Sequence, residues 1–130
     1  MRKKIYGIFL SLWMIMAVAV AQEVPAGLTE AFQKGNAQML STYLAESVEM
    51  ISSEGTQILN RTKAINTLSS FFANNPPTGF ITNHKGKRGE SSFLVGTLST
   101  NGNSFRLNIF FKKDKNNYLI HQIRIDKTHE

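Results

Sequence analysis

An Asn-Gly dipeptide flanked on both sides by alternating apolar residues constrains the C-terminal half of this chain. Asn101-Gly102 is a preferred sequence for a two-residue β-hairpin turn, and it lies between the strand-like segments 93–99 and 104–111. With these two residues as the loop, residue 98 opposes 105, residue 96 opposes 107 and residue 94 opposes 109. One face of the hairpin is then apolar and consists of Leu94, Gly96, Leu98, Phe105, Leu107, Ile109 and Phe111. The opposite face is mixed and consists of Phe93, Val95, Thr97, Arg106, Asn108 and Phe110.

Two further strands are expected around this hairpin, at residues 80–85 and 118–125. We expect a basic loop at Gly86-Lys87-Arg88-Gly89 and a polar loop over residues 112–117. In the last strand, simple alternation places Leu119, Ile123 and Ile125 on the apolar face, with His121 among them. It places Ile120, Gln122 and Arg124 on the mixed face.

The segment before these strands has helical periodicity. A first helix is predicted from Pro25 to Gly35 and a second, capped by Asn36, continues through Leu44, so the two form a helical hairpin. Short strands are expected at residues 48–51 and 56–59, followed by a longer helix that begins near Asn60 or Thr62. Its apolar face consists of Ala64, Ile65, Leu68, Phe71 and Phe72, and Asn74-Asn75-Pro76-Pro77 ends it. The order predicts an α+β fold, with a helical hairpin and a longer helix packed on an antiparallel sheet.

The N-terminus has the three parts of an export signal. Arg2-Lys3-Lys4 precedes an apolar run from Ile5 to Val18, and Ala19-Val20-Ala21 resembles a signal-peptidase site. We therefore expect residues 1–21 to be a signal peptide and residues 22–130 to be one exported domain, periplasmic or extracellular, with no membrane partner after the signal is removed. The alternative is an uncleaved anchor, because the apolar run approaches the roughly 20 residues that span a bilayer.

Composition excludes several classes of function. The chain has no Cys, which excludes disulfides, thiol nucleophiles and cysteine-ligated zinc. Its net charge of +6 falls to +3 once Arg2, Lys3 and Lys4 are removed, which argues against nucleic-acid binding. The three His are widely spaced and no carboxylate pair falls on the apolar face, so we expect no metal and no cofactor.

Ordered motifs along the chain resemble a known family. They are Phe32-Gln33-Lys34-Gly35-Asn36-Ala37, Phe71-Phe72, Phe80 with His84 and Gly86, Val95-Gly96-Thr97-Leu98, Phe105-Arg106 and the run from Tyr118 to Arg124. This set resembles the small secreted bacterial proteins grouped as domain of unknown function 4783, and the element order resembles the cone-shaped nuclear transport factor 2 superfamily. The resemblance implies a curved sheet and a secreted location, but no established activity. Superfamily relatives include isomerases and dehydratases with inward-facing Asp, His or Tyr, an analogy of fold that transfers no chemistry by itself.

His121 and Tyr43 are the candidate ligand-binding residues. An imidazole on an apolar strand face is either a core histidine, hydrogen-bonded to backbone or to Tyr43, or an acid or base at the mouth of the cone. His84 with Lys85, Lys87 and Arg88 forms either an anion site or a solvated loop. His129, beside the C-terminus, is not a candidate.

Two classes of function follow. The first is a non-catalytic binding module, which holds a small apolar ligand in the cone interior or a protein partner on the outer sheet face. The alternative is a small isomerase or dehydratase with His121 as the acid or base. The absence of an inward carboxylate favours the first. Exposed apolar residues of the outer face predict a homodimer through Phe93, Val95, Phe110 and Ile120.

Overall fold

The structure is a computed structural model that describes residues 24–128 of the chain. The predicted signal peptide at residues 1–21 and His129 lie outside the described residues. The elements in chain order are α2 (Ala26–Lys34), η2 (Ala37–Tyr43), β1 (Leu44–Ser52), β2 (Gly55–Asn60), α3 (Arg61–Asn74), β3 (Pro77–Arg88), β4 (Ser91–Thr100), β5 (Asn103–Asp114) and β6 (Asn117–Lys127).

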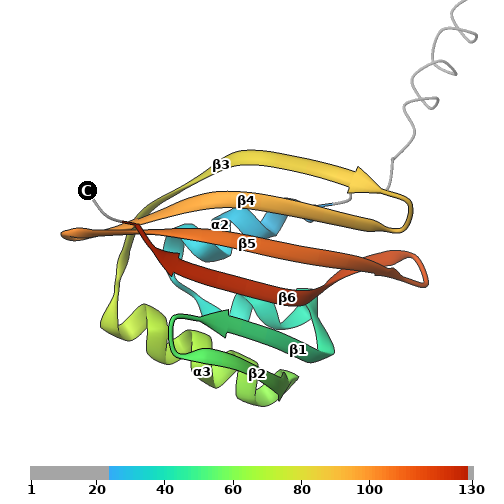
Figure 1. The fold of residues 1–130 in the computed structure, drawn as a ribbon, viewed down its shortest axis with the longest axis horizontal. Coiled ribbons are helices and arrows are strands. Elements are labelled where there is room, and N and C mark those ends of the chain that lie inside the picture. Colours follow the sequence, from blue (N-terminus) through green and yellow to red (C-terminus); the bar gives the residue numbers. More distant parts are fainter. Residues whose placement is uncertain (1–23, 129–130) are drawn as a thin grey trace, which may run out of the picture.

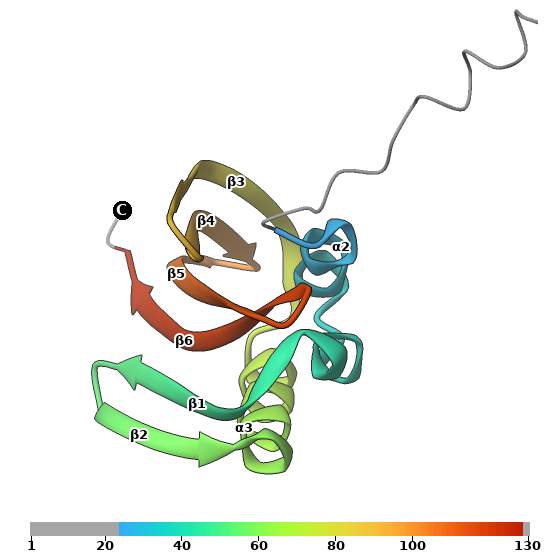
Figure 2. The same cartoon turned by 90° about the vertical axis from the view of Figure 1, so that its right-hand side faces the viewer.

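All six strands form one curved sheet in the order β2-β1-β6-β5-β4-β3 (Figures 1 and 2). Neighbouring strands are antiparallel except β1 and β6, which are parallel. The prediction of an antiparallel meander therefore holds for β3 to β6, while β1 joins this meander by a parallel contact. The expected α+β class, with helices on a curved sheet, is confirmed.

The N-terminal helices form where the sequence predicts them. Gly35 ends α2 with a left-handed φ of 62°, and its N–H donates to Phe32 O at 3.2 Å. A side chain at Gly35 would also meet Pro77 Cδ at 2.7 Å, so both conformation and space favour glycine. Asn36 caps the next turn by accepting from Met39 N–H at 3.2 Å. The second helix is a 3₁₀-helix, a tighter form than the predicted α-helix.

Aromatic contacts join the helices to the inner face of the sheet. The ring of Phe32 in α2 stacks on Phe80 of β3 with centroids 5.1 Å apart, and it meets Phe72 of α3 edge-on at 6.1 Å. Asn60 caps α3 by accepting from Lys63 N–H at 2.8 Å. As predicted, the buried face of α3 consists of Ala64, Leu68 and Phe72, with Ile65 and Phe71 partly buried beside them.

The hairpin register predicted from Asn101-Gly102 is confirmed. Leu98 pairs with Phe105, Gly96 with Leu107 and Leu94 with Ile109. The strands run further than expected, because β3 and β4 pair out to Arg88–Ser91 and β5 and β6 out to Asp114–Asn117. The predicted loops at 86–89 and 112–117 are thus mostly strand with short turns, since cross-strand pairing extends through polar residues that alternation alone does not mark.

For residues 119–121 of β6, the prediction of which side chains face the core is wrong. Phe110 pairs with Gln122 but Phe111 pairs with Ile120, so a β-bulge interrupts the alternation near His121. Ile120 is fully buried, whereas Leu119 and His121 are half-buried. His121 is therefore not a core histidine, and Ile120 is not part of the outer face. The bulge reverses the assignment because one extra residue moves each preceding side chain to the other face.

Candidate binding surfaces

A cavity of about 370 Å³ lies at one open end of the cone, between the β1–β2 hairpin, α3 and the paired ends of β5 and β6. The rings of Phe71 and Phe105 meet edge-on in its wall with centroids 5.0 Å apart. The buried side chains of Leu68 and Met50 complete an apolar floor. The full lining is Met50, Ile51, Ser52, Ser53, Glu54, Gly55, Gln57, Thr67, Leu68, Phe71, Phe105, Ile125 and Lys127.

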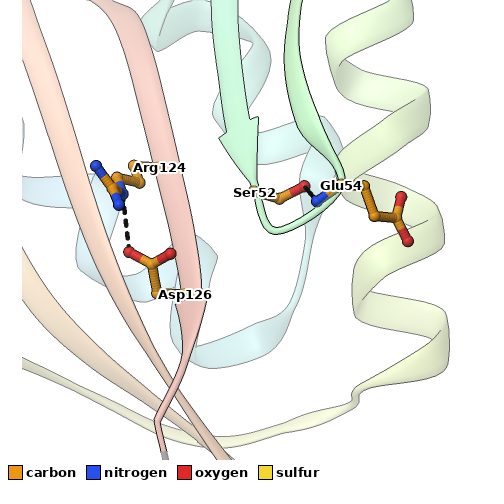
Figure 3. A network of polar contacts seen from close by, with 4 residues as sticks. All are labelled: Ser52, Glu54, Arg124 and Asp126. Atoms are coloured by element: carbon orange, nitrogen blue, oxygen red, sulfur yellow. Dashed lines mark hydrogen bonds and ion pairs between the residues drawn. The ribbon is translucent and has the colours of Figure 1, made fainter.

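Polar side chains surround this apolar floor at the rim of the cavity. The β1–β2 turn is held by Ser52 Oγ, which accepts from Glu54 N–H at 3.2 Å. Figure 3 shows the Glu54 carboxylate extending from this turn on the side of α3. Glu54 and Lys127 are the charged residues of the lining, and both are exposed. An apolar floor with a few polar groups at its mouth is the usual composition of a site for a small, largely apolar ligand.

His121 does not contribute to this cavity. His121 lies on the same face of the sheet as Leu119 and Lys112, which pair with each other across β6 and β5. Burial lowers the pKa of His121 below its usual value of 6.5, and the Lys112 cation lowers it further, while the Asp114 carboxylate opposes both. This burial is partial and lies outside the core.

Tyr43 lines a different cavity, of about 590 Å³. Its lining is Pro25, Ala26, Thr42, Tyr43, Asn116, Asn117, Tyr118 and Leu119. His121 is not part of that lining. Within residues 24–128, no hydrogen bond joins His121 to Tyr43. The structure thus does not bring the two predicted ligand-binding residues together in one cavity.

The outer face of the sheet carries a second surface, with a groove of about 380 Å³ across β4, β5 and β6. Phe93, Val95 and Phe110 line it together with Leu94, Asn108, Ile109, Gln122 and Arg124. Phe110 is 43% exposed, and Ile81 on the adjoining β3 is 62% exposed. Arg124 is held beside this groove by Asp126, whose Oδ2 accepts from Arg124 Nε at 2.9 Å (Figure 3).

His84 also belongs to the outer face. It pairs with Val95, and its ring lies 5.4 Å from that of Phe93. Lys85, Lys87 and Arg88 follow it along β3 and are exposed. Within residues 24–128, no group of three or more His, Asp or Glu side chains is placed to hold a metal ion.

Sequence reasoning did not identify the residues of the cone-mouth cavity. They come from β1, α3, β5 and β6, so their proximity depends on tertiary packing. Periodicity predicts that Phe71 and Phe105 lie on apolar faces, and the structure confirms both positions. What periodicity does not show is that the space between them is left partly unfilled.

The comparisons with known proteins agree with this fold. The sequence model of the family described as Domain of unknown function (DUF4783) matches residues 26–126. A DUF4783 family protein from Bacteroides ovatus is 47% identical, with a TM-score of 0.82 over 84% of this chain and 99% of its own. A second, from Bacteroides fragilis, is 48% identical, with a TM-score of 0.78 over 81% of this chain and 99% of its own. No curated protein matches the chain.

A more distant likeness shows the fold alone. An NTF-2 like protein of unknown function from Silicibacter pomeroyi is 11% identical, with a TM-score of 0.60 over 98% of this chain and 100% of its own.

Across the described part of the chain, no helix is both long and apolar enough to span a bilayer.

Proposed function

The chain belongs to the DUF4783 family, and we propose that it is a non-catalytic binding module that holds a small apolar ligand at the mouth of its cone. The observation that carries this proposal is the cavity of about 370 Å³ whose floor is apolar and whose rim is polar. Its volume falls in the range of small-molecule sites, roughly 300–1,000 Å³. Burial of apolar ligand surface against Phe71, Phe105 and Met50 would supply the affinity.

The charges of the cavity favour binding over catalysis. Acid–base catalysis needs a titratable group placed within hydrogen-bond reach of the reacting atoms, with a pKa suited to proton transfer. The titratable side chains of the lining are Glu54 and Lys127, both exposed at the rim. His121, the acid or base of the alternative enzyme interpretation, lies on the outer face of the sheet, away from this cavity.

We also propose that the domain acts after export. This rests on the sequence of residues 1–21, in which a basic start, an apolar run and small residues at positions 19 and 21 follow one another. Intact-mass measurement on protein recovered from the exported fraction would support it with a chain that begins at Gln22. A mass that retains residues 1–21 would contradict cleavage and favour an anchor.

Binding at the cone mouth can be tested with 1-anilinonaphthalene-8-sulfonate, a dye whose fluorescence rises in apolar surroundings. Thr67 is an exposed residue of α3 that lines the cavity, so Thr67→Phe should fill the mouth without disturbing the core. Ser69→Phe adds the same ring to an exposed position of α3 outside the lining and serves as the matched control. We expect wild-type and Ser69→Phe proteins to bind the dye and Thr67→Phe to lose most of the signal.

A second measurement separates the cavity from the outer face. Phe110→Lys removes apolar surface from the outer groove and leaves the cone mouth intact. Dye binding that survives Thr67→Phe but is lost in Phe110→Lys would contradict the proposal. So would equal loss in Thr67→Phe and Ser69→Phe.

A second candidate function is self-association through the outer face, which the exposure of Phe110 and Ile81 favours. The apolar residues of this face are Phe93, Val95 and Phe110 in the groove, with Ile81 beside them. Ile120, which the sequence placed in this set, lies in the core and does not belong to it. A sheet face of this kind can pair with a second copy about a two-fold axis, so that the same residues are buried on both protomers.

A further inference from the structure

We infer that the end of the sheet formed by the β3–β4 and β5–β6 turns is a docking surface for an anionic lipid bilayer. This inference is independent of the proposed ligand cavity, and it departs from the sequence-based expectation of no membrane partner after signal removal. Positive charge is concentrated at this end, the two turns are in contact there, and the chain enters the domain beside them.

Positive charge is concentrated at this end. Residues 85–90 and 112–115 carry six basic and two acidic side chains, a net charge of +4. The rest of residues 22–130 carries six basic and seven acidic side chains, a net charge of −1. The basic residues are all exposed, and they are Lys85, Lys87, Arg88, Lys112, Lys113 and Lys115. Such segregation of charge marks a surface that attracts an anionic partner.

The two turns form one surface. The backbone N–H of Lys113, at the end of β5, donates to Glu90 O in the β3–β4 turn at 2.8 Å. Ser91 at the start of β4 pairs with Arg88 of β3 on one side and with Lys112 of β5 on the other, so basic residues of β3 and β5 lie two strands apart at this end. Figure 1 shows both turns at the same end of the sheet. Two strand spacings are about 10 Å, so the charges of Arg88 and Lys112 lie within roughly one Debye length of each other at 0.1 M salt.

The chain enters the domain at this same end. Pro25 and Ala26 line a cavity with Asn116 and Asn117, which belong to the β5–β6 turn and the start of β6. The apolar run that ends at Ala21 is separated from Val24 by only two residues, Gln22 and Glu23. Even a fully extended chain spans about 10 Å over that distance. Before the apolar run is cleaved, its insertion in a bilayer would hold the basic end close to the headgroups.

The bilayer is therefore favoured over other polyanions as the partner. Lysines near an anionic leaflet are attracted without needing a specific pocket, which suits side chains spread over two turns. Docking in this way would leave the cone mouth free. The cavity is lined by Phe105 near the start of β5, whereas Lys113 lies near its end, roughly 25 Å further along the strand.

The experiment uses residues 22–130, which contain every described element. The Bacteroides ovatus protein, matched over 99% of its own length by 84% of this chain, shows that a domain of this size folds by itself. Binding is measured by flotation with vesicles of phosphatidylcholine alone and of phosphatidylcholine mixed with phosphatidylglycerol. We expect binding only to the mixed vesicles and release at high salt.

Matched variants locate the surface. Lys85→Gln/Lys113→Gln should weaken vesicle binding by about fivefold for each lysine removed. Lys34→Gln/Lys63→Gln removes the same charge from helices α2 and α3 and should leave binding unchanged. Circular dichroism of both variants checks that each is folded. Equal weakening in the two variants would overturn the proposal, as would no binding to mixed vesicles or binding to heparin with none to vesicles.

Discussion

Ile120 and Ile123 are both fully buried in the core, although they are three positions apart along β6. In a regular strand, residues three apart lie on opposite faces. The bulge between the Phe110–Gln122 and Phe111–Ile120 pairs accounts for the difference. It places His121 on the outer face and makes Ile120 a core residue.

Truncation of Ile120 should therefore cost far more stability than truncation of its neighbour. We expect Ile120→Ala to lower the free energy of unfolding by about 2–5 kcal/mol, because the side chain is fully buried. Leu119→Ala, at a half-buried position, should cost less than about 1 kcal/mol. Urea unfolding of both variants checks this, and the reverse order would show that β6 follows simple alternation.

Gly96 should not tolerate a side chain. A Cβ at Gly96 would collide with the Phe80 ring and lie 2.9 Å from Ile81 O, so the neighbouring backbone would have to move. Gly96→Ala should cost about 1–3 kcal/mol, as overpacking does elsewhere. Gly79→Ala is the control, because nothing lies within 4 Å of its Cβ position. Thermal unfolding of the two variants gives the comparison, and equal melting temperatures would contradict the packing described.

The order of these elements could be predicted from sequence where local chemistry determines structure. Asn101-Gly102 fixes the hairpin register and Gly35 ends α2, because each acts through its own backbone and its immediate neighbours. The bulge at His121 could not be predicted, since it depends on how β6 fits between β5 and the parallel strand β1. The candidate site was missed for the same reason: Met50, Leu68 and Phe105 are far apart in sequence and meet only in the folded chain.

The pKa of His121 should respond in opposite directions to its two charged neighbours. Lys112 lowers it and Asp114 raises it, so Lys112→Gln should raise the pKa and Asp114→Asn should lower it further. Because the folded-state pKa lies below that of the unfolded chain, the unfolded state takes up the proton first. The contribution to stability is full above about pH 6.5 and falls as the pH drops below it. NMR titration of the ring protons measures both shifts.

The effect of His121 on stability should nevertheless be small. The ring is only half-buried, so solvent screens its interactions, and His121→Gln should change the free energy of unfolding by less than about 0.5 kcal/mol. A loss of several kcal/mol at neutral pH would instead indicate a buried hydrogen bond and contradict its placement on the outer face.

Self-association through the outer face predicts a concentration-dependent mass. Phe110→Lys places a charge in the groove and should abolish dimers, whereas Ile58→Lys, at a 73% exposed position of β2 away from the groove, should not. Light scattering over a range of protein concentrations tests both. A wild-type protein that stays monomeric at high concentration would end this second candidate.

The central claim, that the cone mouth binds a small apolar ligand, is tested most directly by methyl NMR during a titration of residues 22–130 with decanoate. We predict saturable shift changes at Met50, Leu68 and Ile125, which line the cavity. Methyl groups of Val95 and Ile81, on the outer face, should be unaffected. Changes confined to Val95 and Ile81, or no saturable change at the cavity methyls, would contradict the claim.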